Sequence, residues 1–172
     1  MNVLMIVLRV VHIFSGVFWV GASFFNLGFL QPTVRATGNE GLKVMQHLTS
    51  RTRFTLTAYT AATLTLLSGW IMYWYLFGFR PSVLSSGYGL SLTIGGIAGT
   101  IAWLIAIILV RRALRRMEAV GRAVQEKGGP PTPEQASNLQ AIGNQLMKLG
   151  QWGVVFMVIA LLGMSAAQYI SL

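Results

Sequence analysis

The chain has 172 residues, of which 54% are hydrophobic and 10% charged, and its formal net charge is +9. Soluble domains carry about 25% charged residues, so this composition indicates a membrane protein of one domain, residues 1–172. The chain has no Cys and only four acidic residues, all Glu, which excludes disulfides and thiolate sites and disfavours a carboxylate metal cage.

The first predicted span covers residues 3–30 and is apolar except for Arg9. About 20 apolar residues cross the hydrocarbon core as a helix, so this segment is long enough. We expect Pro32 to end or kink the helix, because proline lacks a backbone N–H donor. Residues 39–50 then predict an amphipathic helix, capped by Asn39, with Leu42, Met45 and Leu48 on one face.

The second predicted span covers residues 54–79, and Arg80 and Pro81 are expected to end it. Its first half is rich in Thr and Ala. Its second half carries an aromatic run typical of a membrane interface. The members of this run are Trp70, Tyr73, Trp74, Tyr75, Phe77 and Phe79.

The third and fourth predicted spans are residues 90–110 and 152–171, joined by a cytoplasmic helical hairpin over residues 111–151. The helix after the third span should continue to about Lys127. Thr132, Pro133 and Gln135 predict the next helix start, with a threonine cap and a capping box. The expected fold class is therefore all-α, an antiparallel bundle of four transmembrane helices with a cytoplasmic extension.

The basic residues predict which side of the membrane each connection occupies. Arg9 and Arg80 belong to one side, and eleven basic residues belong to the other, which positive-inside counting makes cytoplasmic. Both termini should therefore face outward from a bacterial inner membrane. Because the basic residues flank apolar runs, they indicate lipid contacts rather than nucleic-acid binding. The eleven are Arg35, Lys43, Arg51, Arg53, Arg111, Arg112, Arg115, Arg116, Arg122, Lys127 and Lys148.

Each span carries a stripe of small or polar residues of the kind that packs helices together in lipid. The stripes are His12, Gly16, Trp19, Ser23 and Asn26; Thr55, Ala58, Ala62, Thr65 and Gly69; Gly95, Gly99, Ala102 and Ala106; and Gly153, Phe156, Ala160, Gly163 and Ala167. These surfaces serve packing within one protomer, or join protomers or other membrane subunits.

His12 is the ionisable residue well inside an apolar run, and such residues are candidates for function. Met72 and Met164 are expected at a similar depth. A histidine paired with either thioether suits haem iron or copper(I). The alternatives are a hydrogen bond from His12 within the bundle, proton transfer, or quinone contact. His47 is expected at the opposite, cytoplasmic end.

Six arginines are expected to contact lipid headgroups, and two of them have a second interpretation. Arg51 and Arg53, at the start of the second span, can also bind carboxylates such as haem propionates. The six are Arg51, Arg53, Arg111, Arg112, Arg115 and Arg116.

Three short motifs resemble a known group of proteins. They are His12-Ile-Phe-Ser-Gly-Val-Phe-Trp19-Val-Gly21, Arg51-Thr-Arg53-Phe54 with Leu-Leu-Ser68-Gly69, and Leu-Leu-Gly163-Met164 near the end of the chain. Together they are similar to bacterial four-helix membrane proteins related to the CopD copper-resistance and HemJ haem-biosynthesis groups. The resemblance implies a haem-associated histidine at His12, with Trp19 beside it. The chain lacks the third-helix Lys and the Asn-Glu fourth segment of HemJ, and the His and Met density of a copper importer.

The expected function is therefore a membrane scaffold with a haem b or metal site at His12, with Trp19 and Met164 near the cofactor and Met72 as a further metal ligand. It would act alone or as an accessory subunit of a respiratory or assembly complex. Three alternatives remain: a copper transport or resistance protein, a structural subunit without cofactor, and a HemJ-like protoporphyrinogen oxidase.

Overall fold

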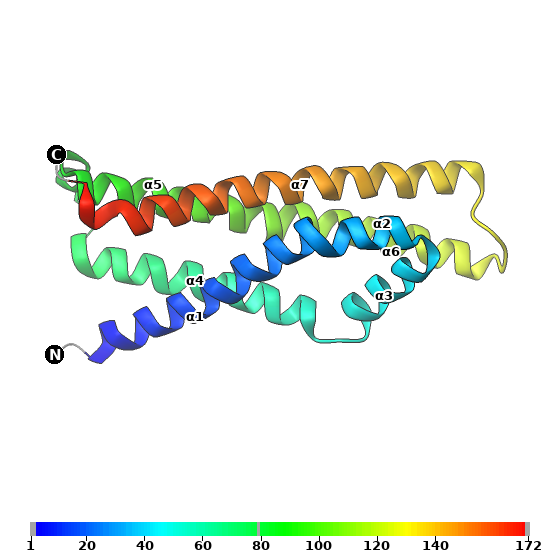
Figure 1. Ribbon diagram of the computed structural model, residues 1–172, viewed down its shortest axis with the longest axis horizontal. Helices are drawn as coiled ribbons and strands as arrows, with labels where there is room; N and C mark the ends of the chain where they lie inside the picture. The colour runs from blue at the N-terminus through cyan, green and yellow to red at the C-terminus, as the bar shows by residue number, and fades with distance from the viewer. Residues whose placement is uncertain (1–2, 79, 171–172) are drawn as a thin grey trace.

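The structure is a computed structural model that describes residues 3–78 and 80–170, and this part of the chain is helical without strands (Figure 1). The expected ends of the second and fourth spans, Phe79 and Ser171, fall outside the described residues. So do the side chains of Asn39 and Leu42, which belong to the expected amphipathic helix.

The helices follow one another with short connections. The first half of the chain contains α1 (Val3–Phe25), the π-helical turn η1 (Asn26–Leu30), α2 (Gln31–Thr37), α3 (Asn39–Ser50) and α4 (Phe54–Phe77). The second half contains the 3₁₀ turn η2 (Pro81–Ser85), α5 (Gly87–Leu104), the π-helical turn η3 (Ile105–Val110), α6 (Arg111–Glu126), α7 (Pro133–Ala166) and η4 (Ala167–Tyr169).

Three continuous helical stretches of the described chain are long and apolar enough to cross a membrane. They are Val3–Thr37, Gly87–Glu126 and Pro133–Tyr169. Each extends well beyond the expected apolar span, because helix continues from the apolar part into a polar part without a break. The composition of these stretches supports a membrane protein.

Pro32 does not end the first helix, and this part of the sequence-based expectation is wrong. The helix continues to Thr37 and stops at Gly38, whose φ of 57° is a backbone conformation that favours glycine. In a regular α-helix the ring of Pro32 would crowd the carbonyl of Gly28, four residues earlier. That carbonyl belongs to η1, whose wider turn accommodates the ring within a continuous helix.

At the other helix boundaries, the structure confirms one of the predicted signals and shifts two others by one to three residues. The capping box at Thr132 is confirmed: its hydroxyl accepts from the N–H of Gln135 at 3.2 Å, and the Gln135 side chain accepts from the N–H of Thr132 at 3.0 Å. The N-cap of α3 is Gly38 rather than Asn39. The second span ends earlier than Arg80, because left-handed Gly78 follows Phe77 and bonds back to Trp74 at 2.7 Å.

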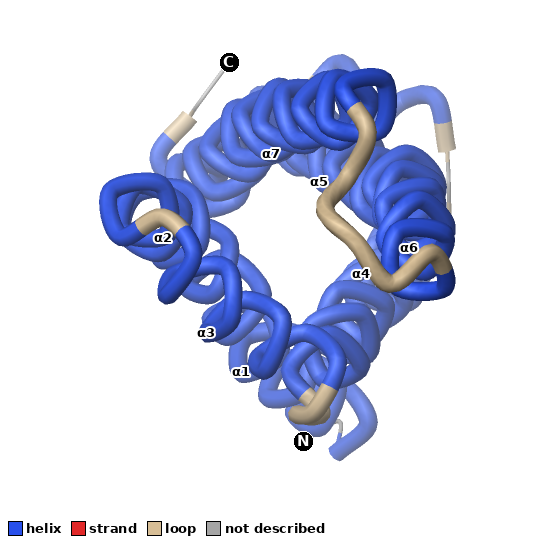
Figure 2. Tube along the Cα trace, turned by 90° about the vertical axis from the view of Figure 1, so that its right-hand side faces the viewer, coloured by secondary structure: helices blue, strands red, loops and turns tan. Residues whose placement is uncertain are grey.

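The long helices pack most closely as two pairs, α1 with α4 and α5 with α7. Viewed end-on, these helices surround a common axis (Figure 2). A cluster of buried side chains joins the pairs, and Trp19 of α1, 7% exposed, belongs to it. The other members are Ala61 and Ala62 of α4, Ala102 of α5 and Met157 of α7.

Hydrogen bonds from aromatic side chains also connect the two pairs, through α4 and α5. The indole N–H of Trp70 donates to the Thr100 hydroxyl at 3.0 Å. The indole N–H of Trp103 donates to the Thr63 hydroxyl at 3.1 Å. Long side chains therefore bridge α4 and α5, whereas each pair has a glycine at a close contact, Gly69 in α1–α4 and Gly163 in α5–α7.

Both ends of the described chain lie at one end of the molecule, together with the α4–α5 connection (Figure 1). The α2–α3 segment and the α6–α7 hairpin lie at the other end. The two basic connections therefore share one end of the molecule, as antiparallel packing of consecutive long helices requires.

Candidate functional site

His12 of α1 lies against the middle of α4, where it meets three consecutive members of one helix face. Its Nδ1 is 2.8 Å from the backbone carbonyl oxygen of Thr65 and 3.3 Å from the hydroxyl of Ser68. A Cβ added at Gly69 would lie 2.8 Å from the Cε1 atom of His12, so only glycine leaves room for the ring there. The imidazole is thus held against α4 by the hydrogen bond to Thr65, and it fits there because Gly69 has no side chain.

The contact with Thr65 determines the tautomer of His12. A carbonyl oxygen carries no proton, so the Nδ1 atom must be the donor. The Ser68 hydroxyl donates to the carbonyl of Leu64 at 2.6 Å, which leaves its oxygen available to accept from the same N–H. In a neutral ring the Nε2 atom then carries the lone pair, and it has no hydrogen-bond partner within residues 3–78 and 80–170.

A second polar contact supports His12 from one turn further along α1. The hydroxyl of Thr65 donates to that of Ser15 at 2.9 Å or to the carbonyl of Ala61 at 2.8 Å. Gly16 also lies against Thr65, at a distance where a Cβ would make ordinary van der Waals contact with the Thr65 methyl group, 3.5 Å. Thr65 therefore contacts α1 with both its backbone carbonyl and its side chain, and fixes the relative positions of the two helices.

Ser15 and Ser68 were missed as members of the site by sequence reasoning. Ser68 was noted in a motif, and Thr65 and Gly69 were placed on the small-residue stripe of α4. The spacing of these three residues, i, i+3 and i+4, puts them on one helix face, and this signal was sufficient to find Ser68. Ser15 had no comparable signal, since its role depends on the register between α1 and α4.

The expected thioether residues lie in different helix pairs. Met72 follows Ser68 by one turn on the same face of α4, the face that meets α1. Met164 belongs to the α5–α7 pair, where a Cβ at Gly95 would lie 3.2 Å from its Cγ. Trp19 lies two turns from His12 along α1, within the buried cluster that joins the helices.

The remaining expected residues lie toward the basic end of the molecule. His47 is exposed on α3, and Arg51 and Arg53 are exposed between α3 and α4. Thr65 is twelve residues beyond Arg53, which corresponds to about 18 Å along a helix. These three residues are therefore separate from His12. The exposed arginines 111, 112, 115 and 116 begin α6, also at the basic end.

The donors around His12 restrict the kind of cofactor that the site can hold. Among the described residues, no group of three or more His, Asp or Glu side chains is placed to share a metal ion. A bare ion would therefore depend on His12 and thioether or backbone donors. A haem brings four nitrogen ligands of its own and needs only axial ligands from the protein, so it is compatible with one histidine.

Comparisons with known protein families, with characterised proteins and with solved structures give no match to this chain. The chemistry of the site is therefore argued from its geometry. The arrangement holds the imidazole of His12 in the tautomer with the proton on Nδ1, and in the neutral ring the lone pair on Nε2 is available to a ligand.

Proposed function

We propose that this chain is a four-span membrane protein that uses the Nε2 atom of His12 as an axial ligand of haem b, and that it acts as an accessory subunit of a respiratory or assembly complex. The observation that carries this proposal is the 2.8 Å contact between Nδ1 of His12 and the Thr65 carbonyl. Histidines that bind metals commonly donate their other ring N–H to a carbonyl, which orients the ring and raises its basicity.

The length and surface of α4 support its assignment as the fourth span. Its 24 residues extend about 36 Å, compared with a hydrocarbon core of about 30 Å. The large side chains that it exposes are apolar, and lipid is the solvent that such a surface requires. They include Leu56 (65% exposed), Leu64 (44%), Leu67 (54%) and Ile71 (44%).

The hydroxyl groups of α4 make it less apolar than the other spans, but their hydrogen bonds reduce the cost of placing them in lipid. Those of Thr57, Thr63 and Ser68 each donate to the carbonyl four residues earlier, at distances of 2.6–2.9 Å, and that of Thr65 donates to the Ala61 carbonyl or to Ser15. Such bonds satisfy polar groups within the helix itself.

The residues around His12 have distinct parts in the proposed site. Thr65 and Ser68 hold the imidazole in the tautomer that leaves Nε2 free. Gly69 gives the ring its space, and Met72 is the nearby thioether on the same face of α4. Haem bound in this way would supply one-electron transfer between partner proteins.

The topology is tested by labelling single cysteines, because the chain has none of its own. Thr52→Cys lies on the α3–α4 connection and Ser85→Cys on the α4–α5 connection, on either side of α4. We expect a membrane-impermeant maleimide to label Ser85→Cys from outside intact cells, and Thr52→Cys only after the cells are opened. Labelling of both positions from the same side would show that α4 does not span the membrane.

The haem proposal is tested by visible absorption of the full chain, purified in detergent and supplied with haem b. We expect a Soret band with a shifted maximum that disappears in His12→Ala and persists in the matched control His47→Ala. Metal analysis accompanies it. Absence of the band with stoichiometric copper bound would favour copper handling, and absence of both would favour a structural subunit.

A further inference from the structure

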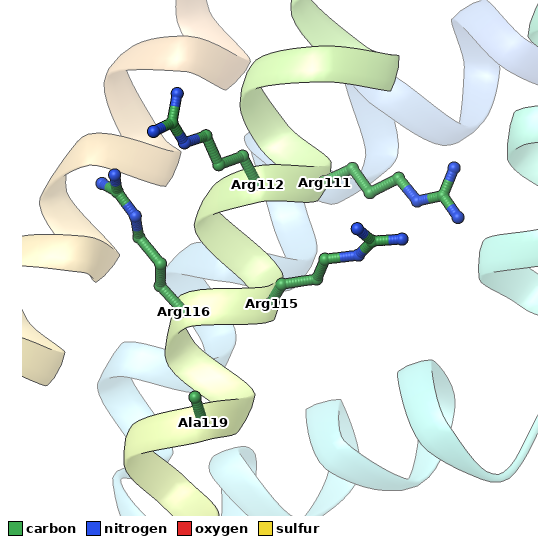
Figure 3. A pocket seen from close by; sticks show the side chains of 5 residues that line it. All are labelled: Arg111, Arg112, Arg115, Arg116 and Ala119. Atoms are coloured by element: carbon green, nitrogen blue, oxygen red, sulfur yellow. The ribbon is translucent and has the colours of Figure 1, made fainter.

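A groove of about 500 Å³ lies at the start of α6, at the basic end of the molecule. It is lined by Arg111, Arg112, Arg115, Arg116 and Ala119 (Figure 3). The arginines form two pairs with i, i+4 spacing. Arg112 and Arg116 extend to one side of the helix, toward α7, and Arg111 and Arg115 extend to the other. A ligand in the groove would therefore meet guanidinium groups on two sides.

The four guanidinium groups lack compensating charges from the protein. Within the described chain, none of them makes an ion pair or a side-chain hydrogen bond, and the ion pair present is Lys43–Glu40 on α3, at 2.6 Å. Glu118 is on the same helix but does not pair with any of them. Four unpaired positive charges within six residues repel one another, and an anion bound between them would relieve that repulsion.

The groove follows directly after a membrane-spanning segment. The preceding residues are uncharged from Leu90 to Val110, and Ile108 and Leu109 are 53% and 43% exposed. The arginines therefore lie at headgroup depth, and the exposed apolar side chains lie at acyl-chain depth. Ala113 is 2% exposed, so this part of α6 is packed firmly against the rest of the molecule.

We propose that this groove is a binding site for an anionic phospholipid whose headgroup carries two phosphates, as in cardiolipin. Each i, i+4 arginine pair binds one phosphate, and Ile108 and Leu109 contact the acyl chains. Guanidinium groups bind phosphate oxygens in a bidentate manner, which lysine cannot do. The inference depends on α5 lying in the membrane and is independent of haem at His12, so either proposal can fail alone.

The test measures lipid retained by the detergent-purified full chain in native mass spectrometry. The probes are cardiolipin, phosphatidylglycerol and phosphatidylcholine with matched acyl chains. We expect cardiolipin to be retained most, and each double variant, Arg111→Gln/Arg115→Gln and Arg112→Gln/Arg116→Gln, to reduce its retention about tenfold, the effect of losing one charged phosphate contact. Circular dichroism checks that the variants remain folded.

The control Arg122→Gln/Lys127→Gln removes two positive charges from exposed positions outside the groove. We expect it to retain cardiolipin like the unsubstituted chain, and replacement of all four groove arginines by Lys to lose much of the retention. An equal loss of cardiolipin retention in the control would show that the effect depends on net charge alone, and it would overturn the proposed site. Equal retention of cardiolipin and phosphatidylglycerol would overturn the two-phosphate assignment. Displacement of the lipid by millimolar inorganic phosphate would identify a site for soluble anions instead.

Discussion

The α5–α7 and α1–α4 interfaces both depend on glycine, but their glycines face different kinds of atoms. A Cβ added at Gly163 of α7 would lie 3.0 Å from the Ser91 carbonyl oxygen and 3.2 Å from the Gly95 backbone. A Cβ at Gly69 of α4 would instead meet the imidazole of His12 at 2.8 Å. Backbone meets backbone in the first interface, whereas in the second the space freed by glycine holds an ionisable side chain.

The two helix pairs are otherwise similar, but the α5–α7 interface serves packing, whereas the α1–α4 interface contains an ionisable group, the imidazole of His12. In α5–α7, the bond between the helices runs from the Ser91 hydroxyl to the Gly163 carbonyl at 2.8 Å, and it closes the contact that the glycines permit. In α1–α4, the bond from His12 to Thr65 leaves a ring nitrogen with unused capacity. In α5–α7 the Ser91 hydroxyl and the Gly163 carbonyl bond to each other, whereas in α1–α4 the Nε2 atom of His12 remains available to a ligand.

The largest expected effect is that of Gly163→Ala. The new methyl group meets backbone on α5, which cannot move aside without separating the helices, so we expect the free energy of unfolding to fall by about 2 kcal/mol. Thermal unfolding in detergent, followed by circular dichroism, measures it. The matched control is Gly143→Ala on the same helix, where the space is open and higher helix propensity should add about 0.5–1 kcal/mol. Equal effects of the two substitutions would contradict a close backbone contact.

Gly69→Ala should cost less stability, about 1 kcal/mol, because the atom that must move belongs to a side chain. It should nevertheless displace the imidazole from Thr65 and weaken the Soret band of the haem-supplied protein. At a temperature at which the Gly163→Ala variant remains folded, its Soret band should have the same maximum as that of the unsubstituted chain. If Gly69→Ala affected stability alone, His12 would have only a packing role.

The smallest expected effects come from two serines. Ser91→Ala removes a bond between helices and should lower the free energy of unfolding by about 0.6 kcal/mol, a typical value for such bonds in membrane proteins. Ser68→Ala removes a hydroxyl that bonds within its own helix, so stability should be nearly unchanged. The readout for Ser68 is the absorption maximum of bound haem, which should shift because the His12 N–H loses a second acceptor. A larger loss of stability from Ser68→Ala than from Ser91→Ala would contradict the proposal that Ser91 stabilises the contact between helices and that Ser68 acts mainly on His12.

Local signals predicted the helix boundaries unevenly. The Thr132 capping box was found because its groups lie within four residues of one another. The helix end expected at Pro32 was predicted incorrectly, because that consequence depends on the preceding turn, and η1 provides a wider one. The two π-helical turns had no recognisable pattern in the sequence, and each changes the direction in which the following side chains extend, including those of the groove arginines.

The sequence singled out His12 as a candidate but did not indicate the residues that it contacts. His12 was recognisable from its apolar surroundings, and the stripes that include Gly95 and Gly163 correspond to close contacts in the structure. The methionines were proposed from expected depth along the helices, and depth alone does not choose between helix pairs. The structure places Met164 against Gly95 of α5, whereas Met72 belongs to α4, one turn beyond Ser68.

Composition and hydrophobic periodicity determined from the sequence alone that the chain is helical, that it belongs in a membrane and that its two basic connections share one end. These properties arise from each segment's own length, polarity and order along the chain. Only the tertiary structure decided that His12 meets Thr65 and Ser68, and that α4 hydrogen-bonds to α5 through tryptophan side chains. Such contacts depend on the register between two helices. The side chains of both helices determine that register together, so it cannot be read from the sequence of either helix by itself.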